Sequence, residues 1–379
     1  MPPMFCRRSP WFSPCHFALL AILCVAVPAL HAETLEHLYD AAVPVADQGD
    51  SQRRQALVAA LDQVLVRITG QEEDVLRANG VLQAERQRPE DYLLEYRYAK
   101  REAPATGAAK AGRRSPAVEP TMELVARFSP ESLRQLLTRA GLPLWPRQRP
   151  ALLVWWQGSA SPTGAPQLLP SDNLKQLAQR RGLPLMLPMN DTEDKLEQEA
   201  LWRLDGDALA RLAERYGIRN ALAGRALPLA GGGWQGQWLF RFEGQAQVLP
   251  AADAFYEAGT LEELESQVLS DVIRLMLLRY AVDLAAPGGQ VELVVSGVGG
   301  YEAYGELTRQ VQSLEAVRSA SLQRVEQRTL YYQVSYDGSL PVLQALLGQS
   351  SRLQAEALPS DPASSSAVPA VLRYRFVRP

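Results

Sequence analysis

The sequence predicts an α/β and α+β protein of three small domains, the middle one with a mostly parallel sheet and the last ferredoxin-like. A length of 379 residues with 47% apolar side chains is typical of a globular chain with two or three cores. Residues 151–227 alternate strand-like and helix-like segments, which predicts parallel strands joined by right-handed crossovers. After Pro287-Gly-Gly289, the order strand, helix, two strands, helix begins a ferredoxin-like unit.

The first α/β domain is predicted over residues 33–150. A strand at 38–45 precedes a helix that Ser51 caps. Apolar residues recur at helical spacing as far as Ile68, so this helix buries one face.

Two later segments of this domain, residues 92–98 and 122–128, alternate well enough to pair as strands. Between them, residues 101–119 are rich in Ala, Pro and Gly, and we expect a disordered excursion on a hairpin. Its basic residues suit either a solvated loop or an arm on anionic polymer or headgroups. The absence of aromatic residues favours the loop.

The middle domain is predicted over residues 151–286 and begins with the apolar run Ala151-Leu-Leu-Val-Trp-Trp156, which is typical of a buried central strand. The expected elements that follow are helices at 171–181 and 205–216, strands at 183–189 and 220–227, an antiparallel hairpin at 235–249 and a helix at 261–284. The last helix carries Asp271, Arg274 and Arg279, so it is predicted to pack on the core and not to cross a membrane.

The last domain is predicted over residues 287–379. Its expected elements are strands at 290–296, 317–323 and 329–336, with helices at 301–314 and 339–347. One more strand completes a ferredoxin-like sheet, and either 353–357 or 371–377 suits that place.

The first 32 residues have the three parts of a secretory signal. Arg7 and Arg8 precede an apolar stretch at 17–27, and Pro28-Ala-Leu-His-Ala32 ends in small residues. Cleavage after Ala32 is preferred to cleavage after Ala29. The sequence therefore predicts a periplasmic protein with no integral membrane span after cleavage.

Cleavage removes Cys6, Cys15 and Cys24, so the mature chain has no thiol, and it leaves His37 as the only histidine. The signal carries two of the 39 basic residues and none of the 42 acidic ones, which gives a mature net charge of about −5. That balance gives no support to nucleic-acid binding. Calcium, zinc and P-loop motifs are missing, and we predict no cofactor and no metal.

Three carboxylates stand where open parallel sheets place ligands. Asp191, Glu193 and Asp194 follow the expected strand at 183–189, and such a group suits acid–base catalysis or a divalent cation. The alternative is that they favour the N-terminus of a following helix, and we prefer it.

Two adjacent indoles, Trp155 and Trp156, suggest a ligand groove for a sugar or a peptide. A Trp-Trp pair in a central strand more often packs against both faces of a sheet, and we prefer that interpretation.

The opening segments Val43-Pro-Val-Ala-Asp-Gln48, Arg54-Gln-Ala-Leu57 and Gln63-Val-Leu-Val-Arg-Ile-Thr-Gly70 resemble the proteobacterial envelope family called domain of unknown function 2066. That family has no assigned activity, so the resemblance implies no catalytic residue. The segment Asp207-Ala-Leu-Ala-Arg-Leu-Ala-Glu-Arg-Tyr-Gly217 and the following Ala221-Leu-Ala-Gly224 resemble the N-terminal α/β module of the TolB type. This resemblance implies a surface for protein contacts, including edge-strand addition.

The function predicted from the sequence is that of an exported periplasmic accessory or assembly protein. It would bind an envelope protein or wall component and catalyse nothing. Two alternatives stay open: a hydrolase of cell-wall glycan or peptide that uses the three carboxylates, and a small-ligand carrier with its pocket beside the two indoles.

Overall fold

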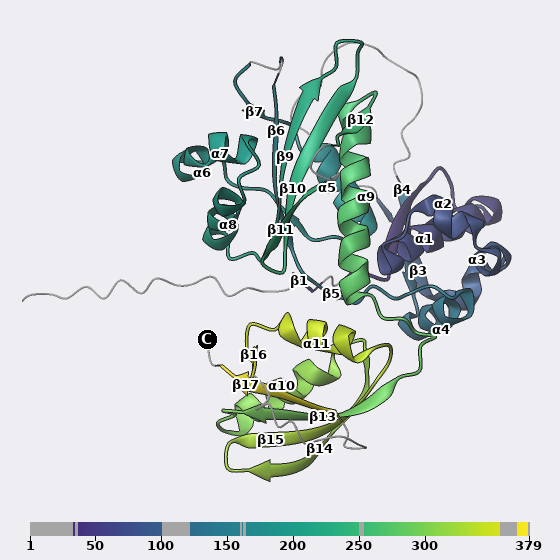
Figure 1. Ribbon diagram of the computed structural model, residues 1–379. Helices are drawn as coiled ribbons and strands as arrows, with labels where there is room; N and C mark the ends of the chain where they lie inside the picture. The colour runs from purple at the N-terminus through teal and green to yellow at the C-terminus, as the bar shows by residue number, and fades with distance from the viewer. Residues whose placement is uncertain are drawn as a thin grey trace, which may run out of the picture.

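The computed structural model describes residues 33–34, 37–100, 122–159, 161, 164–249, 254–356 and 370–377. The signal at 1–32, the excursion at 101–119 and all three cysteines lie outside the described residues. Three larger sheets follow one another along the chain, each with helices packed on it (Figure 1). The predicted mixture of α/β and α+β structure is confirmed.

The first sheet has the order β2-β4-β3, and all its pairs are antiparallel. Its strands are β2 (Asp40–Val45), β3 (Leu93–Lys100) and β4 (Met122–Phe128). Helix α1 (Asp50–Thr69) buries its apolar face on one side of this sheet. Shorter helices complete this unit: α2 (Glu73–Ala78), α3 (Gly80–Glu85), a 3-10 turn η1 (Pro89–Tyr92) and α4 (Pro130–Ala140).

A two-stranded pair leads out of this unit. Strand β1 (Glu33–Thr34) pairs antiparallel with β5 (Gln148–Arg149), so the first described residues lie beside the connection to the middle sheet.

The middle sheet has seven strands, and its central path runs β11-β10-β9-β6-β7. Its strands are β6 (Leu152–Gly158), β7 (Gln167–Leu168), β8 (Leu185–Met186), β9 (Asn220–Pro228), β10 (Trp234–Phe242), β11 (Gln245–Leu249) and β12 (Tyr256–Ala258). The prediction of a mostly parallel sheet holds only for β6 with β8 and β9, because every other pair in the sheet is antiparallel. The reason is that β9 turns directly into β10, and a tight turn forces an antiparallel neighbour.

Helices cover both faces of the middle sheet (Figure 1). One face packs on α5 (Asp172–Arg181) and α9 (Leu261–Tyr280), and the other on α7 (Gln198–Trp202) and α8 (Gly206–Arg215). The short helix α6 (Thr192–Leu196) precedes α7. In the part of the chain that the structure describes, no helix is both long enough and apolar enough to cross a membrane.

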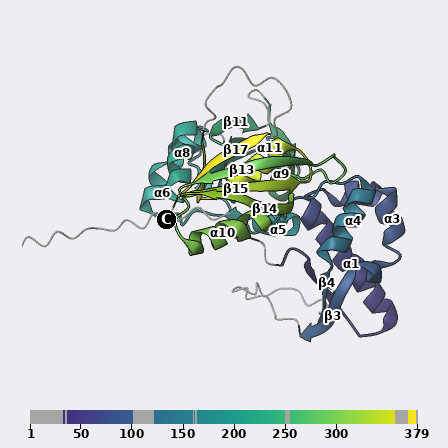
Figure 2. The same ribbon diagram turned by 90° about the horizontal axis from the view of Figure 1, so that it is seen from below.

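The third sheet has the order β14-β15-β13-β17-β16 (Figure 2). Its strands are β13 (Gly289–Ser296), β14 (Val317–Glu326), β15 (Thr329–Tyr336), β16 (Leu353–Ala355) and β17 (Val371–Phe376), and its helices are α10 (Tyr301–Gln312) and α11 (Leu340–Gly348). Both candidates for the last strand are present. Strand β17 lies parallel to β13 and separates it from β16, so the sheet has one strand more than a ferredoxin-like unit.

The second and third sheets share one continuous hydrophobic cluster, whereas the first unit has its own. The predicted boundaries at 150 and 286 therefore stay a prediction.

Candidate functional site

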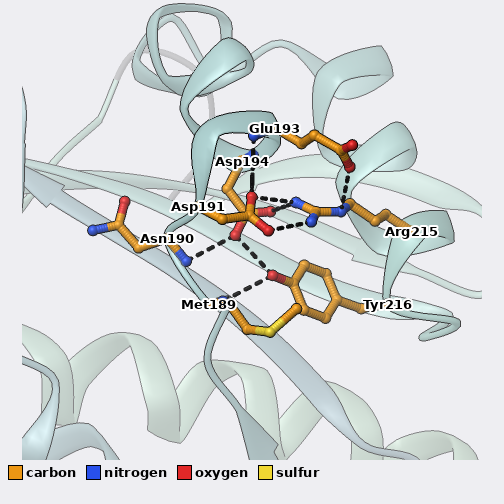
Figure 3. A network of polar contacts seen from close by, with 7 residues as sticks. All are labelled: Met189, Asn190, Asp191, Glu193, Asp194, Arg215 and Tyr216. Atoms are coloured by element: carbon orange, nitrogen blue, oxygen red, sulfur yellow. Dashed lines mark hydrogen bonds and ion pairs between the residues drawn. The ribbon is translucent and has the colours of Figure 1, made fainter.

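The three predicted carboxylates lie at the start of α6, after the edge strand β8 (Figure 3). Asp191 is the N-cap of α6, where its side chain accepts hydrogen bonds from the amides of Glu193 (3.1 Å) and Asp194 (3.0 Å). All three carboxylates form ion pairs with one guanidinium, that of Arg215 on α8. The chain thus brings them together, but around an internal cation.

Asp194 is the most enclosed member of this cluster, with none of its side chain exposed. Its carboxylate accepts hydrogen bonds from the amide of Asn190 (2.8 Å), the hydroxyl of Tyr216 (2.7 Å) and the guanidinium of Arg215. The same hydroxyl accepts a hydrogen bond from the amide of Met189 (2.8 Å). These bonds fasten the segment after β8 to α8.

The electrostatics of the cluster favour the structural role. The hydrogen bond from Arg215, helped by the helix amides, holds the pKa of Asp191 well below its usual range. The same contact raises the pKa of Arg215. A general acid must keep its proton near the working pH, so this arrangement does not favour acid–base catalysis.

The two predicted indoles are both buried. Trp155 is 0% exposed and packs on the α8 side of the sheet, and Trp156 is 1% exposed and packs on the α9 side. Trp238 stacks on Trp156 with ring centroids 4.1 Å apart. Gly224 permits this stack, because a Cβ there would lie 2.1 Å from the Trp238 ring. The place of the predicted groove beside Trp155 and Trp156 is therefore filled by protein, since consecutive strand residues point into opposite cores.

A buried carboxylate that the sequence did not single out lies next to the Trp156 ring. Glu265 on α9 is 3% exposed and accepts a hydrogen bond from the Asn173 side chain (2.7 Å). Burial raises its pKa, and the hydrogen bond from Asn173 offsets only part of that effect.

Replacing Glu265 with glutamine is expected to stabilise the protein at pH 7 by an amount on the order of 1 kcal/mol. A carboxyl whose pKa rises on folding stabilises the fold while it is protonated, below its unfolded pKa, and this contribution is lost as the pH rises through the folded pKa. Glutamine stays neutral, so its advantage should grow between pH 4 and pH 7. Urea unfolding at pH 4 and pH 7 measures the stability difference between Glu265→Gln and the natural chain, with the exposed Glu257→Gln as the control. An equal difference at the two pH values would contradict the prediction.

A cleft of about 930 Å³ lies between the first sheet and the middle unit. One face of the sheet is buried on α1, and the other supplies one wall of the cleft. The opposite wall is formed by α5 and the turn after it, including Lys175, Gln179 and Leu183.

Charged side chains cross the sheet wall in register. Asp40, Arg127 and Glu95 are aligned on β2, β4 and β3, and Arg127 bonds both carboxylates. Burial tends to raise the pKa of Asp40, but the hydrogen bonds from Arg127 and His37 outweigh it and lower the pKa below its usual value. Within the described residues, Arg97 and Glu123 of this wall have no ion-pair partner.

Buried arginines fix the two walls of this cleft relative to each other. Arg181 donates two hydrogen bonds to the Gly70 carbonyl at the end of α1 (2.9 and 2.6 Å). Arg149 is 0% exposed and donates to the carbonyls of Trp145 (2.8 Å), Pro146 (2.8 Å) and Gly182 (2.6 Å). Cations at helix C-termini are favourable, so these contacts join α1 to α5.

The third unit contacts the same junction through the loop before β14. Glu315 accepts hydrogen bonds from the hydroxyl of Tyr39 (3.0 Å) and the amide of Arg147 (2.7 Å). Burial, reinforced by this carboxylate, raises the pKa of Tyr39, which keeps its proton and remains a donor.

Sequence reasoning missed the cleft because its walls come from segments far apart in the chain. The only signal was the polar side of the alternation in the strands at 38–45 and 122–128. His37, the one histidine expected to remain after signal cleavage, lies in the cleft wall with its ring nitrogen 3.2 Å from Asp40. Across the described ranges, no group of three or more His, Cys, Asp or Glu side chains is arranged to hold a metal ion.

Residues 32–146 match a protein family described as a domain of unknown function, DUF8605. The match covers the first sheet and its helices, including the sheet wall of the cleft, and ends before β5. It supports a domain of unknown function at this end of the chain; the resemblances to the 2066 family and to the TolB type stay predictions. A search of curated proteins found no match.

Proposed function

We propose that this protein is a periplasmic accessory or assembly factor that binds an extended segment of an envelope protein along strand β3 and catalyses no reaction. The observation that carries the proposal is the free edge of β3. This strand is the last of its sheet, and no described strand pairs with its outer side. An edge strand offers a row of backbone donors and acceptors to a second chain.

The side chains of β3 indicate what kind of segment fits there. Glu95 and Arg97 point toward the cleft, and their partners on β4, Arg127 and Val125, belong to the same wall. On the other face, Tyr96 and Tyr98 form an edge-to-face pair with ring centroids 6.1 Å apart, and Tyr96 is 42% exposed. A paired strand that alternates acidic and apolar residues would meet Arg97 on one side and the tyrosines on the other.

Export and family resemblance support the same proposal. A signal cleaved after Ala32 would place the mature N-terminus at Glu33, where β1 begins. The resemblance of residues 38–70 to the 2066 family suggests an envelope setting. The TolB-type resemblance suggests protein contacts of the edge-strand kind.

The test begins with photo-crosslinking in cells. A benzophenone side chain at Tyr96 is expected to capture an envelope protein, whereas the same probe at Leu278, which is 80% exposed on α9, should not. The captured protein is then purified. Its binding is expected to slow amide hydrogen exchange in β3, as strand pairing requires.

Charge reversal provides the matched variant. Arg97→Glu is expected to weaken binding of the purified partner about tenfold, which corresponds to ~1.4 kcal/mol. Arg274→Glu on α9 is the control, because that arginine is exposed and remote from β3. Equal crosslinking from Tyr96 and Leu278, unchanged exchange in β3, or full affinity of Arg97→Glu would each contradict the proposal.

A further inference from the structure

A second cleft, of about 610 Å³, lies between the middle and third units. Its floor is the end of the middle sheet at which strands β6 and β9 begin. Ala151, which directly precedes β6, and Asn220, the first residue of β9, line it there. Its roof is α11, which lies across that end of the sheet and of α9 in Figure 1. The cleft is thus at the opposite end of the parallel strands from the place where the carboxylates were predicted.

Two guanidinium groups in this cleft have no carboxylate partner among the described residues. Arg219 donates one hydrogen bond, to the Gly348 carbonyl (3.0 Å), and Arg241 donates one, to the Gly244 carbonyl (3.3 Å). Neither forms an ion pair with a carboxylate of the described chain, whereas the third arginine of the cleft, Arg279, is paired with Glu243 (2.8 Å). A guanidinium has five N–H donors, so Arg219 and Arg241 keep most of theirs for an anion.

An unsatisfied amide lies beside these cations. Gln349 on the cleft wall has its side-chain oxygen and nitrogen both shielded from water and without a hydrogen-bond partner among the described residues. It follows Gly348, whose carbonyl accepts the hydrogen bond from Arg219, and all three residues line the cleft. A buried amide without partners is unfavourable, and a ligand that offers both a donor and an acceptor removes that cost.

The rest of the cleft lining is part polar and part apolar, and its polar members include two carboxylates, Glu214 and Glu243. Pro150, Ile218 and Ala345 contribute small or aliphatic surfaces. Such a wall suits small side chains next to a polar backbone.

We propose that this cleft binds a short peptide through its free terminal carboxylate. Arg219 and Arg241 hold the carboxylate, Gln349 pairs with the last peptide bond, and the aliphatic wall receives small side chains such as alanine. The carboxylate supplies the charge that both arginines lack, and the peptide bond supplies the donor and acceptor that Gln349 lacks. This site is separate from the β3 edge and does not depend on the function proposed for it.

Calorimetry on the mature chain from Glu33 tests the proposal with two probes, acetyl-Ala-Ala with a free carboxylate and acetyl-Ala-Ala-amide. The free acid is expected to bind at least tenfold more tightly than the amide. Arg219→Gln and Arg241→Gln are each expected to weaken the free acid at least tenfold, and Gln349→Leu severalfold. Arg309→Gln, an exposed arginine on α10, is the control and should bind like the natural chain.

Two arginine variants are needed, because Arg219 also donates a hydrogen bond to α11 and its replacement could loosen that helix. Arg241 donates only to the turn at Gly244, so a loss of affinity in Arg241→Gln does not arise from α11. Acetate and inorganic phosphate are the competitors. If either displaces the free acid at an equal concentration, the amide contact is absent and the proposal fails. Equal binding of acid and amide, or unchanged affinity in both arginine variants, would also overturn it.

Discussion

Replacing Asp194 with alanine is expected to lower the free energy of unfolding by about 2–4 kcal/mol. The carboxylate is fully buried and accepts hydrogen bonds from Asn190, Arg215 and Tyr216. Its removal leaves the Asn190 amide and the Tyr216 hydroxyl without an acceptor, while Arg215 keeps its ion pairs with Asp191 and Glu193. A donor that loses its acceptor in a buried place costs the desolvation of that donor.

Its neighbour Glu193 provides the matched control. Glu193 forms an ion pair with the same arginine, at 3.1 Å, but its side chain is 74% exposed. Glu193→Ala is therefore expected to change the free energy of unfolding by less than about 1 kcal/mol. Urea denaturation of both variants measures the difference.

The same pair of variants separates the structural role from the hydrolase alternative. If purified protein degraded peptidoglycan and the folded Glu193→Ala variant lost that activity, the carboxylates would be catalytic. A loss of stability below about 1 kcal/mol in Asp194→Ala would contradict the structural role of the hydrogen-bonded network drawn in Figure 3.

Replacing Arg149 with methionine is expected to lower the free energy of unfolding by about 3–5 kcal/mol. Methionine fills a similar length but offers no donors, so the buried carbonyls of Trp145, Pro146 and Gly182 lose their partners. Burial lowers the pKa of Arg149, while the nearby Glu315 acts in the opposite direction. The guanidinium nevertheless stays charged, because arginine is not deprotonated in proteins.

The effect of this variant should also be local to the junction. Hydrogen exchange is expected to speed up at the end of α5 and in the chain between α4 and β6, before it does so in the third sheet. Arg180→Met is the control, because Arg180 lies in the last turn of α5, near the contact with Arg149, and is exposed. Uniform exchange throughout the chain, or equal stability of the two variants, would show that Arg149 does not hold the units together.

The sequence predicted individual helices and strands where hydrophobic periodicity agreed with the turn and capping residues. The helix predicted after a Ser51 cap is α1, but it begins at Asp50 with Gly49 as its N-cap, so the predicted cap is wrong. The strand predicted at 329–336 is β15. Helix α5 ends at Gly182, which adopts φ 68°, because glycine tolerates the left-handed conformation that closes a helix.

Pairing partners were harder to predict. The strand expected at 183–189 is reduced to the two residues Leu185–Met186, because only these reach the edge of β6. Strand β17 inserts next to β13, and the alternation of Leu372, Tyr374 and Phe376 shows that it is half-buried but not which strand it joins. Periodicity reports which face of a strand is buried, and the neighbour is chosen by the rest of the chain.

Most strands and helices of the three sheets, and the lack of standard catalytic motifs, are readable from the amino-acid sequence. They follow from periodicity, turn residues and composition, which act within a few residues of each other. The roles of the polar residues depend on how the folded chain packs. Arg215 turns three candidate catalytic carboxylates into an internal ion cluster, and Arg219, Arg241 and Gln349 gather into a cleft. The physical reason is that a side chain's charge and hydrogen bonding are set by neighbours that lie tens to hundreds of residues away in the chain.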